Sequence, residues 1–168
     1  VSFTGSTETG RRFLHYAAVS IIKMVVLECG GMIPSVVFDD AENLDHVAEH
    51  VVNAAFWNAG QNCSATSRLI VHQAVKAPLM ERIEARLRDW KTGDPLDPGN
   101  HIGVLIDAEH CTKVRSFLTA EDKGEGPFVA PVLYEVDKGD PKAKEEIFGP
   151  VLSVIEAASN DEAIELAT

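Results

Sequence analysis

Residues 35–72 read SVVFDDAENLDHVAEHVVNAAFWNAGQNCSATSRLIVH, and this stretch predicts how the chain folds. Its ends, 35–38 and 68–72, are short β-rich runs, which is typical of strands. Between them, apolar residues follow the i, i+3, i+4, i+7, i+8, i+11 spacing of one helix face: Leu44, Val47, Ala48, Val51, Val52 and Ala55. Gly60 is placed to end this helix. The order strand, helix, strand favours an α/β fold.

The same alternation extends to both sides. Further strands are expected at 1–4, 21–27, 129–136 and 151–155. Further helices are expected from an N-cap at Ser6 to about residue 19, along the face Leu79, Ile83, Leu87 and Trp90, and at 107–118. The chain is therefore predicted to form a mostly parallel sheet covered by helices.

Composition excludes several classes of protein. The net charge is −11 over 168 residues, which opposes binding to a nucleic-acid backbone. No apolar run approaches the roughly 20 residues of a membrane span, so a soluble protein without a membrane partner is expected. Cys29, Cys63 and Cys111 are an odd number without metal-binding spacing, which favours a reducing, cytoplasmic location.

Four motifs occur in a fixed order. They are Phe-Thr-Gly-Ser-Thr at 3–7, Glu-Cys-Gly-Gly at 28–31, Gly-Gln-Asn-Cys at 60–63 and Glu-Glu-Ile-Phe-Gly-Pro at 145–150. In these motifs and their order the chain resembles the NAD(P)-dependent aldehyde dehydrogenase superfamily over essentially its whole length. The resemblance implies a catalytic-domain-like fold of that family and the oxidation of a small-molecule aldehyde to a carboxylic acid with NAD or NADP. It also implies a homo-oligomer.

The resemblance assigns a role to each motif. It implies that Cys63 is the nucleophile and Glu28 the general base. For the cofactor, it implies that Gly5 and Ser6 approach the dinucleotide, that Glu146 hydrogen-bonds the nicotinamide ribose, and that Phe148 packs near the same end.

The residue types suit this chemistry. A thiol attacks an aldehyde as the thiolate, so Cys63 needs a proton acceptor, and Glu28 is a suitable one. Each motif also has a plainer interpretation. Cys63 is then a small buried apolar residue, and Ser6 an ordinary helix cap. Glu146 is then a solvated carboxylate, and Phe148 a core ring.

Departures from the family pattern bear on domains and length. A family subunit is roughly three times longer, so residues 1–30 correspond to the end of the NAD(P)-binding domain and 31–168 to a catalytic domain truncated at its C-terminal end. Met32-Ile33 stands where a lysine and a polar residue are usual, and some twenty family residues are missing between Lys123 and Gly126. A cysteine at the position that matches Cys29 occurs in branches of the family that resemble those oxidising amino-aldehydes. A non-catalytic fragment that only associates is therefore an alternative hypothesis.

A rival motif belongs to another class of enzyme. His46-Val47-Ala48-Glu49-His50 matches a zinc peptidase pattern, with two histidines at i, i+4 beside a glutamate. The apolar stripe of this helix places His46, Glu49 and His50 on the opposite, solvated face, so a zinc hydrolase is disfavoured and no metal site is expected. The other histidines, including His110, show no ligand spacing and are interpreted as surface or packed residues.

Overall fold

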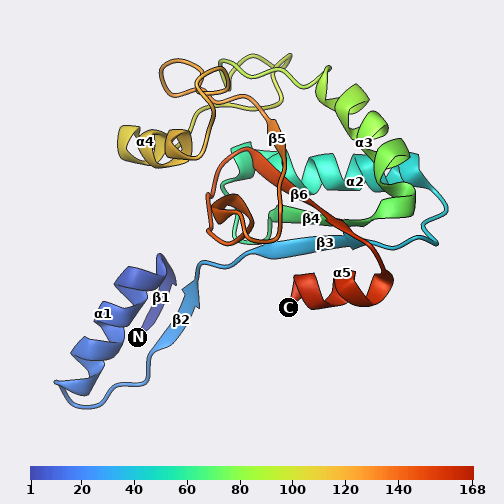
Figure 1. Ribbon diagram of the computed structural model, residues 1–168. Coiled ribbons are helices and arrows are strands. Elements are labelled where there is room, and N and C mark those ends of the chain that lie inside the picture. The colour runs from blue at the N-terminus through green and yellow to red at the C-terminus, as the bar shows by residue number, and fades with distance from the viewer. The chain divides into compact units, whose positions relative to one another are not determined.

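The computed structural model describes all 168 residues, which divide into two compact units, Val1–Gly31 and Met32–Thr168. The division falls after Gly31. Figure 1 shows the ribbon of both units, with the first in blue. No helix in the structure is long and apolar enough to cross a membrane.

The first unit is a strand, a helix and a strand: β1 (Ser2–Gly5), α1 (Thr7–Ala18) and β2 (Val26–Cys29). β1 and β2 are parallel. Ser6 is the N-cap of α1, as predicted, and its Oγ accepts a hydrogen bond from the N–H of Thr9 at 3.3 Å. The strand predicted at 21–27 is correct only from Val26 onward, because the four-residue β1 offers no partner to earlier residues and Ile22 has a φ of 52°.

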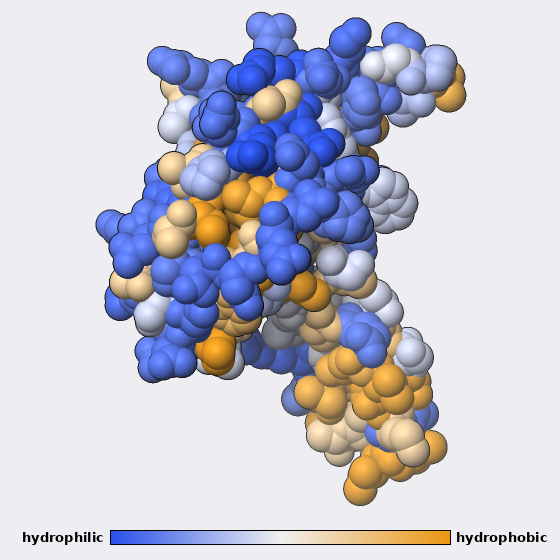
Figure 2. All heavy atoms as spheres, turned by 90° about the vertical axis from the view of Figure 1, so that its right-hand side faces the viewer, coloured by the Kyte–Doolittle hydropathy of each residue, from blue (hydrophilic) through white to orange (hydrophobic).

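Apolar side chains gather on the surface of this first unit. Figure 2 shows an orange, apolar area on this unit. In α1 and the segment that follows it, six large hydrophobic residues are exposed: Leu14, Tyr16, Val19, Ile21, Ile22 and Met24. Most monomeric surfaces avoid such a concentration of apolar side chains.

The second unit is built on a four-stranded sheet in the order β3-β4-β6-β5, and every pairing is parallel. The strands are β3 (Ile33–Val37), β4 (Thr66–His72), β5 (Val132–Glu135) and β6 (Val151–Ala157). The helices are α2 (Leu44–Phe56), α3 (Gln73–Leu87), α4 (Ala108–Ser116) and α5 (Asn160–Ala167), with short 3-10 turns η1 (Trp57–Gly60) and η2 (Pro141–Ala143). The expected mostly parallel, helix-covered α/β sheet is confirmed.

Alternating side chains of the central strands separate two cores. In β4, Leu69 and Val71 join the large core with α2 and α3, while Ile70 joins a smaller core with α5. The alternation follows from the period of two residues along a strand. In Figure 1, α2 and α3 lie over one face of the sheet and α5 over the other.

The helices depart from the predictions at their ends. α2 stops at Phe56 rather than near Gly60, because Asn58, Ala59 and Gly60 all have positive φ. α3 stops at Leu87, so Trp90 lies beyond the helix. α5 was not expected; Ser159 caps it by accepting from the N–H of Glu162, a cap signal that precedes only eight helical residues.

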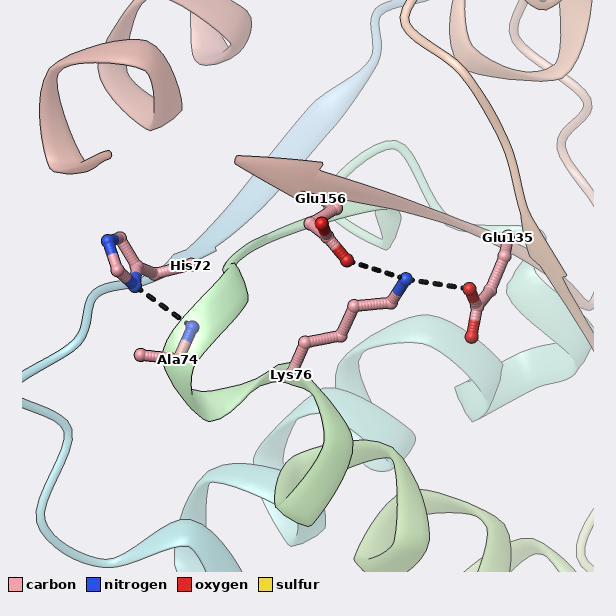
Figure 3. Close-up of polar contacts among 5 residues, drawn as sticks. All are labelled: His72, Ala74, Lys76, Glu135 and Glu156. Carbon is pink, nitrogen blue, oxygen red and sulfur yellow. Dashed lines mark hydrogen bonds and ion pairs between the residues drawn. The ribbon is translucent and has the colours of Figure 1, made fainter. Parts of the chain in front are cut away.

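A lysine links α3 to the carboxyl ends of two strands. His72, the last residue of β4, caps α3 by accepting from the N–H of Ala74 at 3.2 Å. One turn into the helix, the ammonium of Lys76 lies 2.7 Å from Glu135 of β5 and 3.0 Å from Glu156 of β6 (Figure 3). The hydrogen bond to Glu135, followed by that to Glu156, raises the pKa of Lys76 although burial opposes it. The arrangement ties a helix to the ends of the two strands.

Candidate active site

The chain before Cys63 forms a left-handed turn. Within η1, Asn58 and Ala59 have φ of 55° and 57°, and Gly60 has φ of 68°. Non-glycine residues adopt this conformation at a cost of roughly 1–2 kcal/mol each, so contacts must hold the turn. The Nδ2 of Asn58 donates to the carbonyl of Gln61 at 3.0 Å, and the N–H of Gln61 donates back to the carbonyl of Asn58 at 3.1 Å.

Cys63 itself is exposed, directly before β4. The Oδ1 of Asn62 accepts from the N–H of Ser64 at 3.1 Å, and the N–H of Ala65 donates to the carbonyl of Asn62 at 3.0 Å, so Cys63 sits in a closed turn. Cys29 is half-buried and Cys111 is buried. The interpretation of Cys63 as a buried apolar residue is therefore wrong.

Two of the motifs meet at a pair of glycines. A Cβ on Gly60 would lie 2.2 Å from the carbonyl oxygen of Gly149, so the backbones of the Gly-Gln-Asn-Cys turn and the Glu-Glu-Ile-Phe-Gly-Pro turn are in direct contact. Only glycine permits this approach at a positive φ. Cys63 is thereby fixed relative to the turn that carries Phe148.

The Phe148 turn presents its residues in different ways. Ile147 is buried in the large core, whereas Glu146 and Phe148 are half-buried. Phe148 has a φ of 60°, which turns the chain sharply before Gly149. Phe148 is therefore not a core ring, and the large apolar side chain that this motif places in the core is that of Ile147.

The first unit brings its own motif residues to one sheet edge. Thr4 pairs with Glu28 and Gly5 with Cys29. The exposed Glu28 therefore lies beside the carboxyl end of β1, close to where the chain continues into Ser6. The carboxyl ends of parallel strands and the N-terminus of the following helix are favourable places for an anionic cofactor group.

The first turn of α1 fits a phosphate electrostatically. Its one acidic residue, Glu8, is paired with Arg12 one turn further on. This pairing offsets a negative charge that would otherwise oppose a phosphate at the helix N-terminus. Gly5 and Ser6 are therefore compatible with a dinucleotide pyrophosphate.

The residues of the rival zinc motif have other partners. His46, Glu49 and His50 are exposed on α2, as predicted. The Nε2 atoms of the two histidines lie 2.9 Å apart in a hydrogen bond, and Glu49 faces Arg86 of α3 at 3.8 Å. The structure contains no group of three or more histidine, cysteine or carboxylate side chains arranged around a metal ion.

Two residues to which the sequence analysis gave no role in the site form hydrogen bonds that hold its loops in place. The Oε1 of Gln61 accepts from the N–H of Ile106 at 2.8 Å, and its Nε2 donates to the carbonyl of Val104 at 3.3 Å. His110 reaches the carbonyl of Phe148 at 2.7 Å. Gln61 stands in a recognised motif, but its partners are more than forty residues away, and His110 carries no local signal.

The loop that Gln61 contacts also lines a cavity. A cavity of about 400 Å³ lies between η1 and the loop that precedes α4, and its lining includes Trp57, Asn58 and residues 100–104. The cavity therefore borders the turn that leads to Cys63.

The profile of the aldehyde dehydrogenase family matches residues 1–168. The chain belongs to the aldehyde dehydrogenase family. It is similar to an aminoacetaldehyde dehydrogenase of Pseudomonas aeruginosa, with 54% identity over 181 residues that cover 99% of this chain and 36% of the relative. That alignment is longer than the 168-residue chain, so the relative has residues within it that this chain lacks.

Solved aldehyde dehydrogenases show the same fold. The crystal structure of a gamma-glutamyl-gamma-aminobutyraldehyde dehydrogenase from Burkholderia cenocepacia superposes with a TM-score of 0.91 at 37% identity, covering 99% of this chain and 37% of that one. A 1-pyrroline-5-carboxylate dehydrogenase from Thermus with bound NAD gives 0.89 at 34% identity, covering 99% and 36%. The expected family fold is confirmed, and the chain spans about a third of the length of these relatives.

Proposed function

We propose that this chain supplies the nucleophile Cys63 and the general base Glu28 of an enzyme that oxidises an aldehyde to a carboxylic acid with NAD or NADP. The observation that carries the proposal is the setting of Cys63. It is the one exposed cysteine, and it follows a left-handed turn whose Gly60 is in contact with Gly149 of the Phe148 turn. A merely packed cysteine needs no such setting.

The chemistry of Cys63 and Glu28 proceeds in two stages. Glu28 takes the thiol proton, directly or through a water, and the Cys63 thiolate adds to the carbonyl carbon of the aldehyde. The N–H of Cys63 donates to the oxyanion that forms. A bound dinucleotide would supply the hydride acceptor needed to oxidise that carbon to the Cys63 thioester. Glu28 releases the thiol proton to bulk water and, as a carboxylate again, removes a proton from a water molecule. Attack of that water on the Cys63 thioester releases the carboxylic acid, and the departing Cys63 thiolate takes the proton back from Glu28.

Four residues are proposed to hold the cofactor. Gly5 and Ser6 face the pyrophosphate at the N-terminus of α1, where the helix dipole and backbone N–H groups favour an anion. Glu146 hydrogen-bonds the nicotinamide ribose, and Phe148 packs at the same end. The bound NAD of the Thermus relative supports NAD as the cofactor.

The substrate is proposed to be an aldehyde that carries an amino group. The support is the 54% identical relative, named as an aminoacetaldehyde dehydrogenase. A net charge of −11 also favours the approach of a cationic substrate.

A second candidate is association without turnover. The chain spans 36% of its relative, and its first unit exposes apolar residues that suit contact with another protein surface. Homo-oligomerisation is proposed, with no nucleic-acid or membrane partner. The three free cysteines support a reducing, cytoplasmic location.

The deciding experiment removes the nucleophile from the complete enzyme that contains this chain. Cys63→Ala should abolish aldehyde oxidation, since no neighbouring group forms a thioester as readily. Mass spectrometry after brief alkylation should find the label on Cys63 before Cys29 or Cys111. Cys29→Ala is the matched control and should keep the label on Cys63. Retained oxidation in Cys63→Ala, or earlier labelling of Cys111, would overturn the proposal.

A further inference from the structure

The carbonyl of Phe148 is held by a side chain from α4. The Nε2 of His110 lies 2.7 Å from that oxygen, and the His110 ring meets the Phe148 ring edge to face at a centroid distance of 6.0 Å. A carbonyl oxygen only accepts, so Nε2 must carry the proton. His110 therefore contacts Phe148 through both its backbone and its ring.

Phe148 needs such support because its backbone is strained. Its φ of 60° is uncommon for a bulky side chain and persists only where surrounding contacts determine it. α4 contacts the turn at a second point, since a Cβ on Gly149 would lie 2.8 Å from both methyl groups of Val114. Helix α4 therefore contacts both Phe148 and Gly149.

The segment that leads into α4 is also hydrogen-bonded to the loop that carries Cys63. Ile106, just before Asp107, the N-cap of α4, donates its N–H to Gln61, two residues before Cys63. The Oδ1 of Asp107 accepts from the N–H of His110 at 2.7 Å, which fixes where the histidine leaves the helix. The backbone contact between Gly60 and Gly149 completes this set of contacts. The loop that carries Cys63, the Phe148 turn, and helix α4 with the segment that leads into it therefore each contact the other two.

We infer that His110 is a positioning residue for the reaction. By donating to the Phe148 carbonyl it holds the left-handed turn, and through that turn it sets both the Phe148 ring and the Gly149 backbone against which the Cys63 loop rests. The inference rests on the proposed function, because it gives Phe148 and Cys63 their roles. It predicts that the donor of His110, rather than its bulk, matters for cofactor binding and thiol reactivity.

Two substitutions separate the donor from the ring. His110→Phe keeps a ring that can meet Phe148 but removes the donor, whereas His110→Gln keeps an N–H donor without the ring. In the complete enzyme, His110→Phe should raise the KM for NAD roughly tenfold and slow alkylation of Cys63, with a smaller change in kcat. His110→Gln should stay within about threefold of the parent in both measurements.

The thermal unfolding midpoint of each variant distinguishes positioning from general stability. A role in packing alone would lower the midpoint of His110→Phe while leaving KM and the alkylation rate of the folded protein unchanged, and that result would overturn the inference. Equal losses in His110→Gln and His110→Phe would also overturn it.

A third measurement separates this inference from the proposed function. Long-range ¹H–¹⁵N NMR should find the proton of the neutral His110 ring on Nε2, whether or not the enzyme oxidises aldehydes. A proton on Nδ1 would overturn the inference. An inactive parent enzyme with the proton on Nε2 would instead remove the proposed function and leave the contact in place.

Discussion

At the scale of single residues, backbone strain is concentrated where the motifs lie. Four non-glycine residues have positive φ, and three of them, Asn58, Ala59 and Phe148, belong to the turns that meet at Gly60 and Gly149. Such strain is retained where it serves a site. The motif residues were predictable as residue types, whereas this conformation was not.

Gly60→Ala should be severely destabilising. The substitution combines a positive φ with a Cβ only 2.2 Å from the Gly149 carbonyl oxygen, and neither backbone can move without disturbing a motif. A loss of about 3 kcal/mol or more in the free energy of unfolding is expected. Chemical denaturation measures it. Gly139→Ala, with open space around its Cβ, is the control and should change stability by less than about 1 kcal/mol.

Glu28→Gln tests the base. If Glu28 mainly activates water for thioester hydrolysis, the complete enzyme carrying Glu28→Gln should still show a pre-steady-state burst of reduced cofactor, followed by slow turnover. Stopped-flow absorbance of reduced cofactor measures both phases. An unchanged steady-state rate would remove Glu28 from the mechanism.

At the scale of elements, the central strands and the helices α1 and α2 were predictable because their patterns are regular and their caps are local. The strand ends were not, since a strand extends only as far as its neighbour does. β2 begins at Val26, opposite Ser2, although the β-rich run begins five residues earlier. The end of α3 depends likewise on tertiary contacts, because Trp90 packs against Phe56 and stacks on His101.

Lys76→Met tests the link between α3 and the two strand ends. It leaves Glu135 and Glu156 without their shared cation, and a loss of about 1 kcal/mol at neutral pH is expected for these partly exposed pairs. Urea denaturation measures it, with the exposed Lys91→Met as the control. A loss no larger than that of Lys91→Met would show that the pairs contribute little.

The pH dependence of this link has a definite sign. The pKa of Lys76 is raised in the folded state, chiefly by the hydrogen bond to Glu135, so its stabilisation is present below the unfolded value and is lost as pH rises through the folded value. On the alkaline side, the difference between the parent and Lys76→Met should therefore shrink above about pH 10.5. A difference that shrank near pH 8 would contradict this origin.

At the scale of the whole molecule, the two units hold different parts of the proposed site. Gly5, Ser6 and Glu28 lie in the first, while Cys63 and Phe148 lie in the second. The chain also spans only 36% of its Pseudomonas relative. The complete reaction is therefore proposed for the enzyme that contains this chain.

The 168-residue polypeptide alone should associate and remain inactive. The exposed apolar residues of its first unit favour contact between chains. Few residues would hold the dinucleotide, so the Kd for NAD should be weaker than about 1 mM. Light scattering, cofactor titration and an aldehyde assay test this. A monodisperse monomer that binds NAD at micromolar concentration and reduces it would contradict the expectation.

The sequence by itself determined the α/β class, the order of the main elements and the family, because hydrophobic periodicity, caps and short motifs are local and survive without knowledge of the fold. Only the tertiary structure decided that Gly60 lies against Gly149, that Gln61 braces residues 104–106 and that His110 holds the Phe148 carbonyl. These contacts join residues about forty to ninety positions apart, and no local pattern records them. They depend on how the strands order in the sheet and on backbone conformations that only dense packing sustains.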